Sequence, residues 1–398
     1  MALPERKSDY PRSLVLLFLA VYFCMGLRMI LGLVIKDLFR LYLKLDPAES
    51  QFFSSFMVIP WSLKPLYGIL SDNVRLFGEY RLSYIRTMTF LAIVFQILSF
   101  LLCTSNKYVV LVILTSNQVA NAFLDVVTDA LLIAVSRKNP ERGAEDLQSM
   151  RYATIAFGGL IGAAVGSWYT ERFHPRYAFL FLPLPLTVIF GLTFYVDEEQ
   201  HAGADESANV PQDRLKAAFG FLRTPLALRT SIYTFVVGTL SISFGDIMYF
   251  YLLDKLGFTK QFYGIIIIAV FASSILGSAL YNCFLRNAEY RNIFTVSQII
   301  IVCYDALQVL FVMRVTKTVL GLDDRLVALF STASEEVLDQ ALRFMPAVVL
   351  ISKITPPRVE GTVYSIFASI NNFTFGFLAP SIGAALASYY GVSRTNFT

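Results

Sequence analysis

Long apolar stretches, most of them about 20 residues or longer, recur along the whole of this 398-residue chain. A stretch of that length spans a bilayer only as an α-helix, because every backbone polar group must then be satisfied within the segment. The composition agrees: 56% of the residues are hydrophobic, 16% are charged, and the mean hydropathy is +0.59. The stretches are continuous and do not alternate in about ten-residue units, which excludes a transmembrane barrel.

We therefore expect an all-α polytopic membrane protein in two unequal halves. The first half (1–195) holds six spans, a polar cytoplasmic linker (196–229) follows, and the second half (230–398) holds five. The linker has too little apolar surface to fold alone. Lys and Arg favour a cytoplasmic N-terminus by a modest excess. The expected spans lie near residues 13–35, 51–70, 82–103, 108–134, 147–169, 177–195, 230–253, 261–284, 292–313, 326–350 and 362–388.

Several function classes are not expected from this composition. The net charge of +4 is too small and too scattered for nucleic-acid binding. The four cysteines lie in or at the ends of apolar runs without metal-site spacing, so we expect no metal and no cofactor. The two histidines, His174 and His201, lie in expected loops, and no nucleophile–base pair accompanies them. An enzyme is not expected.

The fourth span carries a polar stripe, NQVANAFLDVVTDALL (117–132). Gln118, Asn121, Asp125 and Asp129 are three and four residues apart, so they share one helical face. Charge inside a span costs about 2.5–3.5 kcal/mol, so such residues face protein or water. Two carboxylates one turn apart also repel, which prepares one of them to bind a proton. The stripe predicts either a helix that lines an aqueous path or ion pairs that lock the bundle.

Other spans carry charge at a similar depth. In the tenth span, STASEEVLDQALRFMP (331–346), the side chains of Glu335, Asp339 and Arg343 follow one another at intervals of four residues. The first span supplies Arg28 and the seventh supplies Asp246. The first, fourth, seventh and tenth expected spans therefore all carry charge.

Lys64 is a lysine in the apolar and aromatic stretch IPWSLKPLYGILSD (59–72). Pro60 and Pro65 flank it, and prolines weaken the helix and free backbone carbonyls. Asp125 or Asp129 is the expected partner of this lysine. A switchable ion pair, a direct substrate contact and a static structural pair all remain open.

A faint internal repeat relates the two halves. The stretch VSRKNPERG (135–143) resembles ISKITPPRVEG (351–361), and a helix rich in small residues follows each. Two related halves joined by a linker are typical of major facilitator transporters. In such a fold the second half would be one helix short, so the expected arrangement is 6 + 5 spans with the twelfth helix missing.

The chain also resembles the folate–biopterin transporters of the major facilitator superfamily. PWSLKPLYGILSD (60–72), FLDVVTDALL (123–132) and DLQSMRYATIAFGGLIGA (146–163) carry the resemblance. It implies folate or pterin transport by alternating access, with protons as a coupling partner. It gives weight to Lys64, Asp125 and Asp129, and the candidate gating residues are Gly68, Asp72, Gln148, Ser149 and Arg151.

We expect a monomer in the lipid bilayer, with the plasma membrane as the first expectation and an organellar membrane as the alternative. Two other functions stay open. One is transport of another small solute on the same fold, and the other is a non-transporting relative with a binding or regulatory role.

Overall fold

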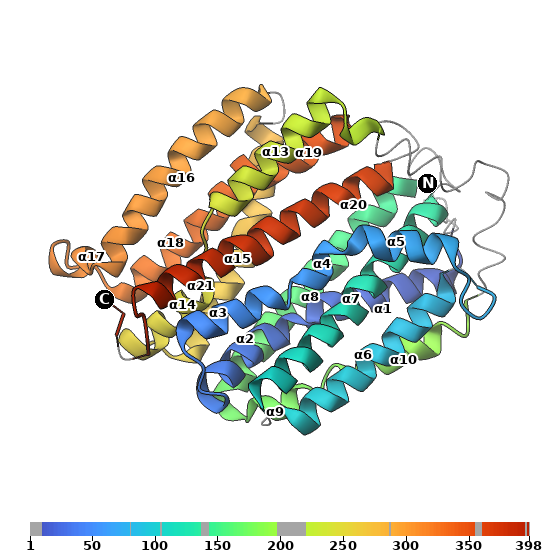
Figure 1. The fold of residues 1–398 in the computed structure, drawn as a ribbon, viewed down its shortest axis with the longest axis horizontal. Coiled ribbons are helices and arrows are strands. Elements are labelled where there is room, and N and C mark those ends of the chain that lie inside the picture. Colours follow the sequence, from blue (N-terminus) through green and yellow to red (C-terminus); the bar gives the residue numbers. More distant parts are fainter. Residues whose placement is uncertain are drawn as a thin grey trace, which may run out of the picture.

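The structure is a computed structural model that describes residues 10–79, 81–103, 106–136, 143–196, 220–285, 288–354, 360–394 and 396–397. Helices dominate these residues and run roughly side by side (Figure 1). By length and composition, seven helical segments among them are apolar enough to cross a membrane. The protein is thus a helical multi-pass membrane protein, as expected. The division into 6 + 5 spans stays a prediction.

The first half of the chain forms one group of packed helices, drawn from blue to green in Figure 1. Two of its rods are interrupted: α1 continues into α2 through Arg28, and a second rod is divided into α3, α4 and α5. The helices are α1 (Arg12–Leu27), α2 (Met29–Asp37), α3 (Pro47–Phe56), α4 (Ile59–Ser62), α5 (Lys64–Asn73), α6 (Leu82–Leu102), α7 (Lys107–Ser136), α8 (Gly143–Arg172), α9 (Pro175–Ala178) and α10 (Pro183–Leu192).

The second half forms the other group, drawn from yellow-green to red (Figure 1). Its helices are α13 (Pro225–Leu240), α14 (Gly245–Phe250), α15 (Lys260–Leu280), α16 (Tyr290–Val312), α17 (Val315–Thr318), α18 (Asp324–Asp339), α19 (Met345–Ile354), α20 (Glu360–Asn371) and α21 (Ala379–Tyr389). Wider π-helical turns interrupt the rods at Leu38–Tyr42, Tyr251–Lys255, Tyr281–Leu285, Gln340–Phe344 and Asn372–Leu378.

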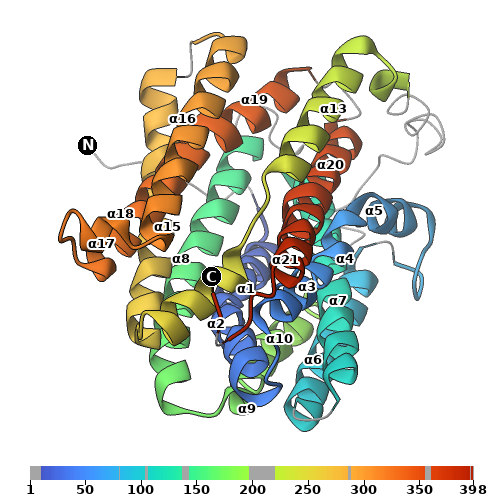
Figure 2. The same cartoon turned by 60° about the vertical axis from the view of Figure 1, so that its left-hand side comes forward.

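The two halves pack through a few helices. α8 of the first half lies along α15 of the second, and α3 lies along α21 (Figure 2). The first half holds the larger apolar core, which α1, α6, α7 and α10 build together. A smaller core in the second half centres on α14 and the π-helical turn that follows it.

A similar connection follows the helices of the first and the seventh expected span. The π-helical turn Leu38–Tyr42 is followed by Lys44 with φ 52°, and the turn Tyr251–Lys255 is followed by Gly257 with φ 70°. Each connection ends on an N-cap residue, Asp46 before α3 and Thr259 before α15. The two connections thus share one local geometry, and the division into two related halves stays a prediction. The repeat expected at 135–143 and 351–361 lies partly outside the described residues, as does most of the expected linker.

Candidate functional site

Lys64 takes its position from a break in the second rod. Pro60 and Pro65 interrupt the helical hydrogen bonds, and the rod is divided at Leu63, so that Lys64 begins α5. Its Nζ lies 2.6 Å from Oδ2 of Asp125 on α7. The side chain of Asp125 is 5% exposed and that of Lys64 is 17% exposed. Of the two expected partners, the structure therefore brings Asp125 to the lysine.

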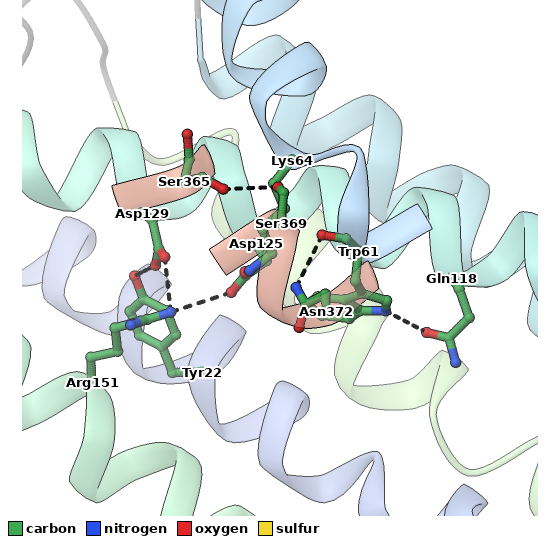
Figure 3. Close-up of polar contacts among 10 residues, drawn as sticks. All are labelled: Tyr22, Trp61, Lys64, Gln118, Asp125, Asp129, Arg151, Ser365, Ser369 and Asn372. Carbon is green, nitrogen blue, oxygen red and sulfur yellow. Dashed lines mark hydrogen bonds and ion pairs between the residues drawn. The ribbon is translucent and has the colours of Figure 1, made fainter. Parts of the chain in front are cut away.

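Arg151 joins both carboxylates of α7 (Figure 3). Its Nη2 lies 2.8 Å from Asp129 and 3.5 Å from Asp125. The hydroxyl of Tyr22 on α1 donates to Asp129 at 2.9 Å, and the guanidinium lies over the Tyr22 ring. Arg151 was expected to be a gating residue, and here it sits within the carboxylate cluster.

A second polar group adjoins this cluster. Gln118 Oε1 accepts one hydrogen bond from Arg28 Nη2 at 2.8 Å and another from the indole Nε1 of Trp61 at 3.2 Å. The Trp61 ring centroid lies 5.0 Å from Lys64 Nζ and 5.8 Å from the Arg28 guanidinium. The indole thus has two cations within 6 Å of its ring centroid, a distance at which cation–π attraction operates.

The second half contributes an acidic group. Arg343 forms an ion pair with Asp339 one turn away and lies 4.6 Å over the Phe375 ring. Glu335 on α18 is exposed.

The first-half site holds three cations and two carboxylates, namely Arg28, Lys64, Arg151, Asp125 and Asp129. The first-half site therefore holds one more cation than carboxylates.

Two expected site residues have partners outside these groups. Asn121 donates to the Asn117 carbonyl at 2.7 Å and so bonds back to its own helix. Asp246 forms an ion pair with Lys36 at 3.0 Å and accepts from Ser54 at 2.5 Å. It belongs to a group that joins the halves at their other end.

We call that group the lock: Lys36, Asp37, Ser54, Asp246, Tyr249 and Lys260. Asp37 is fully buried, lies 2.5 Å from Lys260 Nζ, and accepts a hydrogen bond from the Tyr249 hydroxyl at 2.7 Å. Each half thus places a carboxylate against a lysine of the other. In the orientation with a cytoplasmic N-terminus, the lock closes the outer side.

The other candidate gating residues are only partly described. Gly68 lies on α5, where an added Cβ would lie 3.8 Å from Val126 of α7, an ordinary contact distance. Asp72 lies near the end of α5, and Gln148 and Ser149 lie in the first turns of α8. Their side chains lie outside the described part of the structure. Within that part, no group of three His, Cys, Asp or Glu side chains is placed to hold a metal.

Sequence reasoning missed the roles of Tyr22 and of Lys36, Asp37 and Lys260. Lys36 and Lys260 lie at the ends of expected spans, where a lysine reaches water at little cost, so the sequence alone predicts no ion pair for them. The signal for them was Asp37, an acidic residue at the end of a long apolar span.

The fold is that of the major facilitator transporters. The nucleoside transporter NupG superposes with a TM-score of 0.72 at 12% identity, covering 96% of this chain and 94% of that one. A D-xylose–proton symporter gives a TM-score of 0.69 at 12% identity, covering 96% of this chain and 92% of that one.

The chain belongs to the BT1 family, whose model matches residues 25–398. "Probable folate-biopterin transporter 4" of Arabidopsis thaliana is 25% identical over 99% of this chain and 92% of its own length. "Folate-biopterin transporter" of Synechocystis is 26% identical over 98% and 78%. "Folate transporter 2" of Plasmodium falciparum is 24% identical over 87% and 74%. Family membership makes this chain a membrane transporter and not an enzyme.

Proposed function

We propose that the protein carries a folate or a pterin across the membrane by alternating access, with proton movement coupled to the cluster on α7. The observation that carries the proposal is the group of three cations, two carboxylates and one indole described above. The names of the relatives supply the substrate class.

The charge balance supports an anionic heteroaromatic substrate. The carboxylate of a folate tail would meet Lys64 or Arg28, and a pterin ring would stack near Trp61. Arg343, the cation of the second-half group, already pairs with Asp339. Arg28 of the first half contacts the neutral Gln118 and has no carboxylate partner among the described ion pairs, so we assign the anionic end to the first half.

Proton coupling follows from the shared arginine. Asp129 is the more accessible carboxylate, with its side chain 29% exposed, against 5% for Asp125. When Asp129 takes a proton, Arg151 loses one of its two partners. It can then compete with Lys64 for Asp125, which frees the Lys64 ammonium for a substrate carboxylate.

Uptake of labelled folate and biopterin tests the proposal in cells that cannot make folate. We expect uptake that is faster at mildly acidic than at neutral pH and is inhibited by unlabelled folate or biopterin but not by unrelated solutes. D125N and D129N should weaken or remove the pH dependence. D324N, which changes a carboxylate paired with Arg314 and Lys317 at the other end of the bundle, should keep it.

If both amide variants keep the wild-type pH dependence, the proposal that proton movement is coupled through this cluster is wrong. If another solute is taken up and folate and biopterin are not, the substrate assignment is wrong. The monomeric state and the plasma membrane location remain predictions beside this proposal.

A further inference from the structure

The carbonyl oxygen of Trp61 lacks its usual partner within the helix. In an α-helix this oxygen would accept the N–H of the residue four positions later. That residue is Pro65, which has no N–H. A carbonyl left free by proline inside a membrane bundle needs another donor.

Asn372 of the second half supplies that donor. Its Nδ2 lies 3.1 Å from the Trp61 oxygen (Figure 3). Asn372 begins the π-helical turn Asn372–Leu378, just after α20 ends at Asn371. Such turns re-aim side chains within a helix and are frequent at functional sites.

The two elements also pack closely beside this hydrogen bond. An added Cβ on Gly376 would lie 2.5 Å from Val58 Cγ1, closer than real Cβ atoms approach. The glycine thus lets the π-helical turn approach the residue that precedes α4. The Asn372 hydrogen bond therefore lies in a well-defined contact between the halves.

The contact fixes a backbone position whose side chain is central to the site. The Trp61 indole donates to Gln118, has two cations within 6 Å of its ring centroid, and adjoins the lysine that pairs with Asp125. A shift of the Trp61 backbone would move the indole relative to all of these groups.

We propose that Asn372 is a positioning residue that reaches across from the second half, replaces the N–H missing at Pro65, and so holds Trp61 in register with the cation site. The structural part stands whatever solute is carried, and only the transport readout rests on the proposed function.

Trp61 fluorescence tests the structural part without any substrate. The chain has two tryptophans, Trp61 and Trp168, so W168F leaves Trp61 as the only one. In that background we expect N372A to shift the emission maximum of the purified protein. N371A is the matched control and should leave it unchanged, because the Asn371 side chain makes no hydrogen bond among the described contacts. An unchanged spectrum in N372A overturns the proposal.

Restoring the missing N–H gives a sharper test. P65A places a donor four residues after Trp61, which makes Asn372 redundant. We expect N372A to raise the KM for uptake roughly fivefold, the size typical of one lost buried hydrogen bond, with kcat less affected. In the P65A background the same change should fall below about twofold.

An equal effect of N372A in both backgrounds means that Asn372 does not act through the Trp61 carbonyl, which contradicts the proposal. If the chain carries neither folate nor biopterin, the fluorescence comparison decides. It uses the W168F background alone and the same background with N372A, with P65A and with both changes. The shift caused by N372A must then shrink in the P65A background.

Discussion

At the scale of single residues, the carboxylate cluster is unequal in its pairing. Asp125 faces two cations, Lys64 at 2.6 Å and Arg151 at 3.5 Å, whereas Lys64 has Asp125 as its ion-pair partner among the described residues. Removing one member of a buried pair leaves the other charge uncompensated. The cost therefore depends on whether a second partner remains.

D125N should destabilise the protein more than K64M does. In D125N the lysine is left without its carboxylate, for which the expected loss is about 3–5 kcal/mol. In K64M the carboxylate keeps Arg151, so the loss should be clearly smaller. Melting temperatures in one detergent measure the difference, and the double variant shows whether the two changes are coupled. A larger loss in K64M would contradict this account of the cluster.

At the scale of elements, α1 and α8 approach each other through glycines. An added Cβ on Gly26 would lie 2.2 Å from the Ile155 carbonyl oxygen, and one on Gly158 would lie 2.5 Å from the Phe23 oxygen. Small residues that let backbones approach are typical of membrane helix pairs. This contact holds Tyr22 and Arg28 of the first rod against the helix that carries Arg151.

G26A should therefore separate α1 from α8 and lower the melting temperature sharply. The same rod offers a control, since an added Cβ on Gly32 would meet nothing within 4 Å. G32A should be neutral or stabilising by up to about 1 kcal/mol, because alanine favours a helix over glycine. Equal melting temperatures for the two variants would mean that the close contact does not limit stability.

At the scale of the whole molecule, the lock joins the two halves at one end of the bundle. Asp37 and Asp246 each form an ion pair with a lysine of the opposite half. Arg40 of the first half pairs with Asp254 of the second. Opening this end requires all these groups to separate. The ion pairs therefore favour the conformation seen here.

D37N should shift the population toward a form open at the lock. A cysteine at Ala48, which is buried beside Ile247 and Ala387, would report the change once the exposed Cys283 and Cys303 are replaced by serine. With A48C we expect D37N to speed labelling by an impermeant thiol reagent about tenfold, equivalent to about 1.4 kcal/mol. K317M, which alters an exposed pair within the second half, should leave the rate unchanged. An unchanged labelling rate in D37N would contradict the claim that the ion pairs of the lock favour this conformation.

Much of this protein was determined by local sequence. The length of the apolar stretches predicts membrane-spanning helices. Spacings of three and four residues place Gln118, Asp125 and Asp129 on one face of α7, because helical geometry is set by neighbouring residues. The sequence also predicted that Lys64 would need a carboxylate. Membership in the BT1 family agrees with the resemblance to folate–biopterin transporters that the sequence motifs carry.

The tertiary structure alone decided the partners. Arg151 bridges both carboxylates, Asp246 belongs to the lock, and Asn372 reaches Trp61 from 311 positions away. Pro65 predicts that the Trp61 carbonyl lacks a donor, but nothing local predicts which side chain replaces it. That choice depends on how the two halves pack, and local periodicity carries no information about the packing of distant helices.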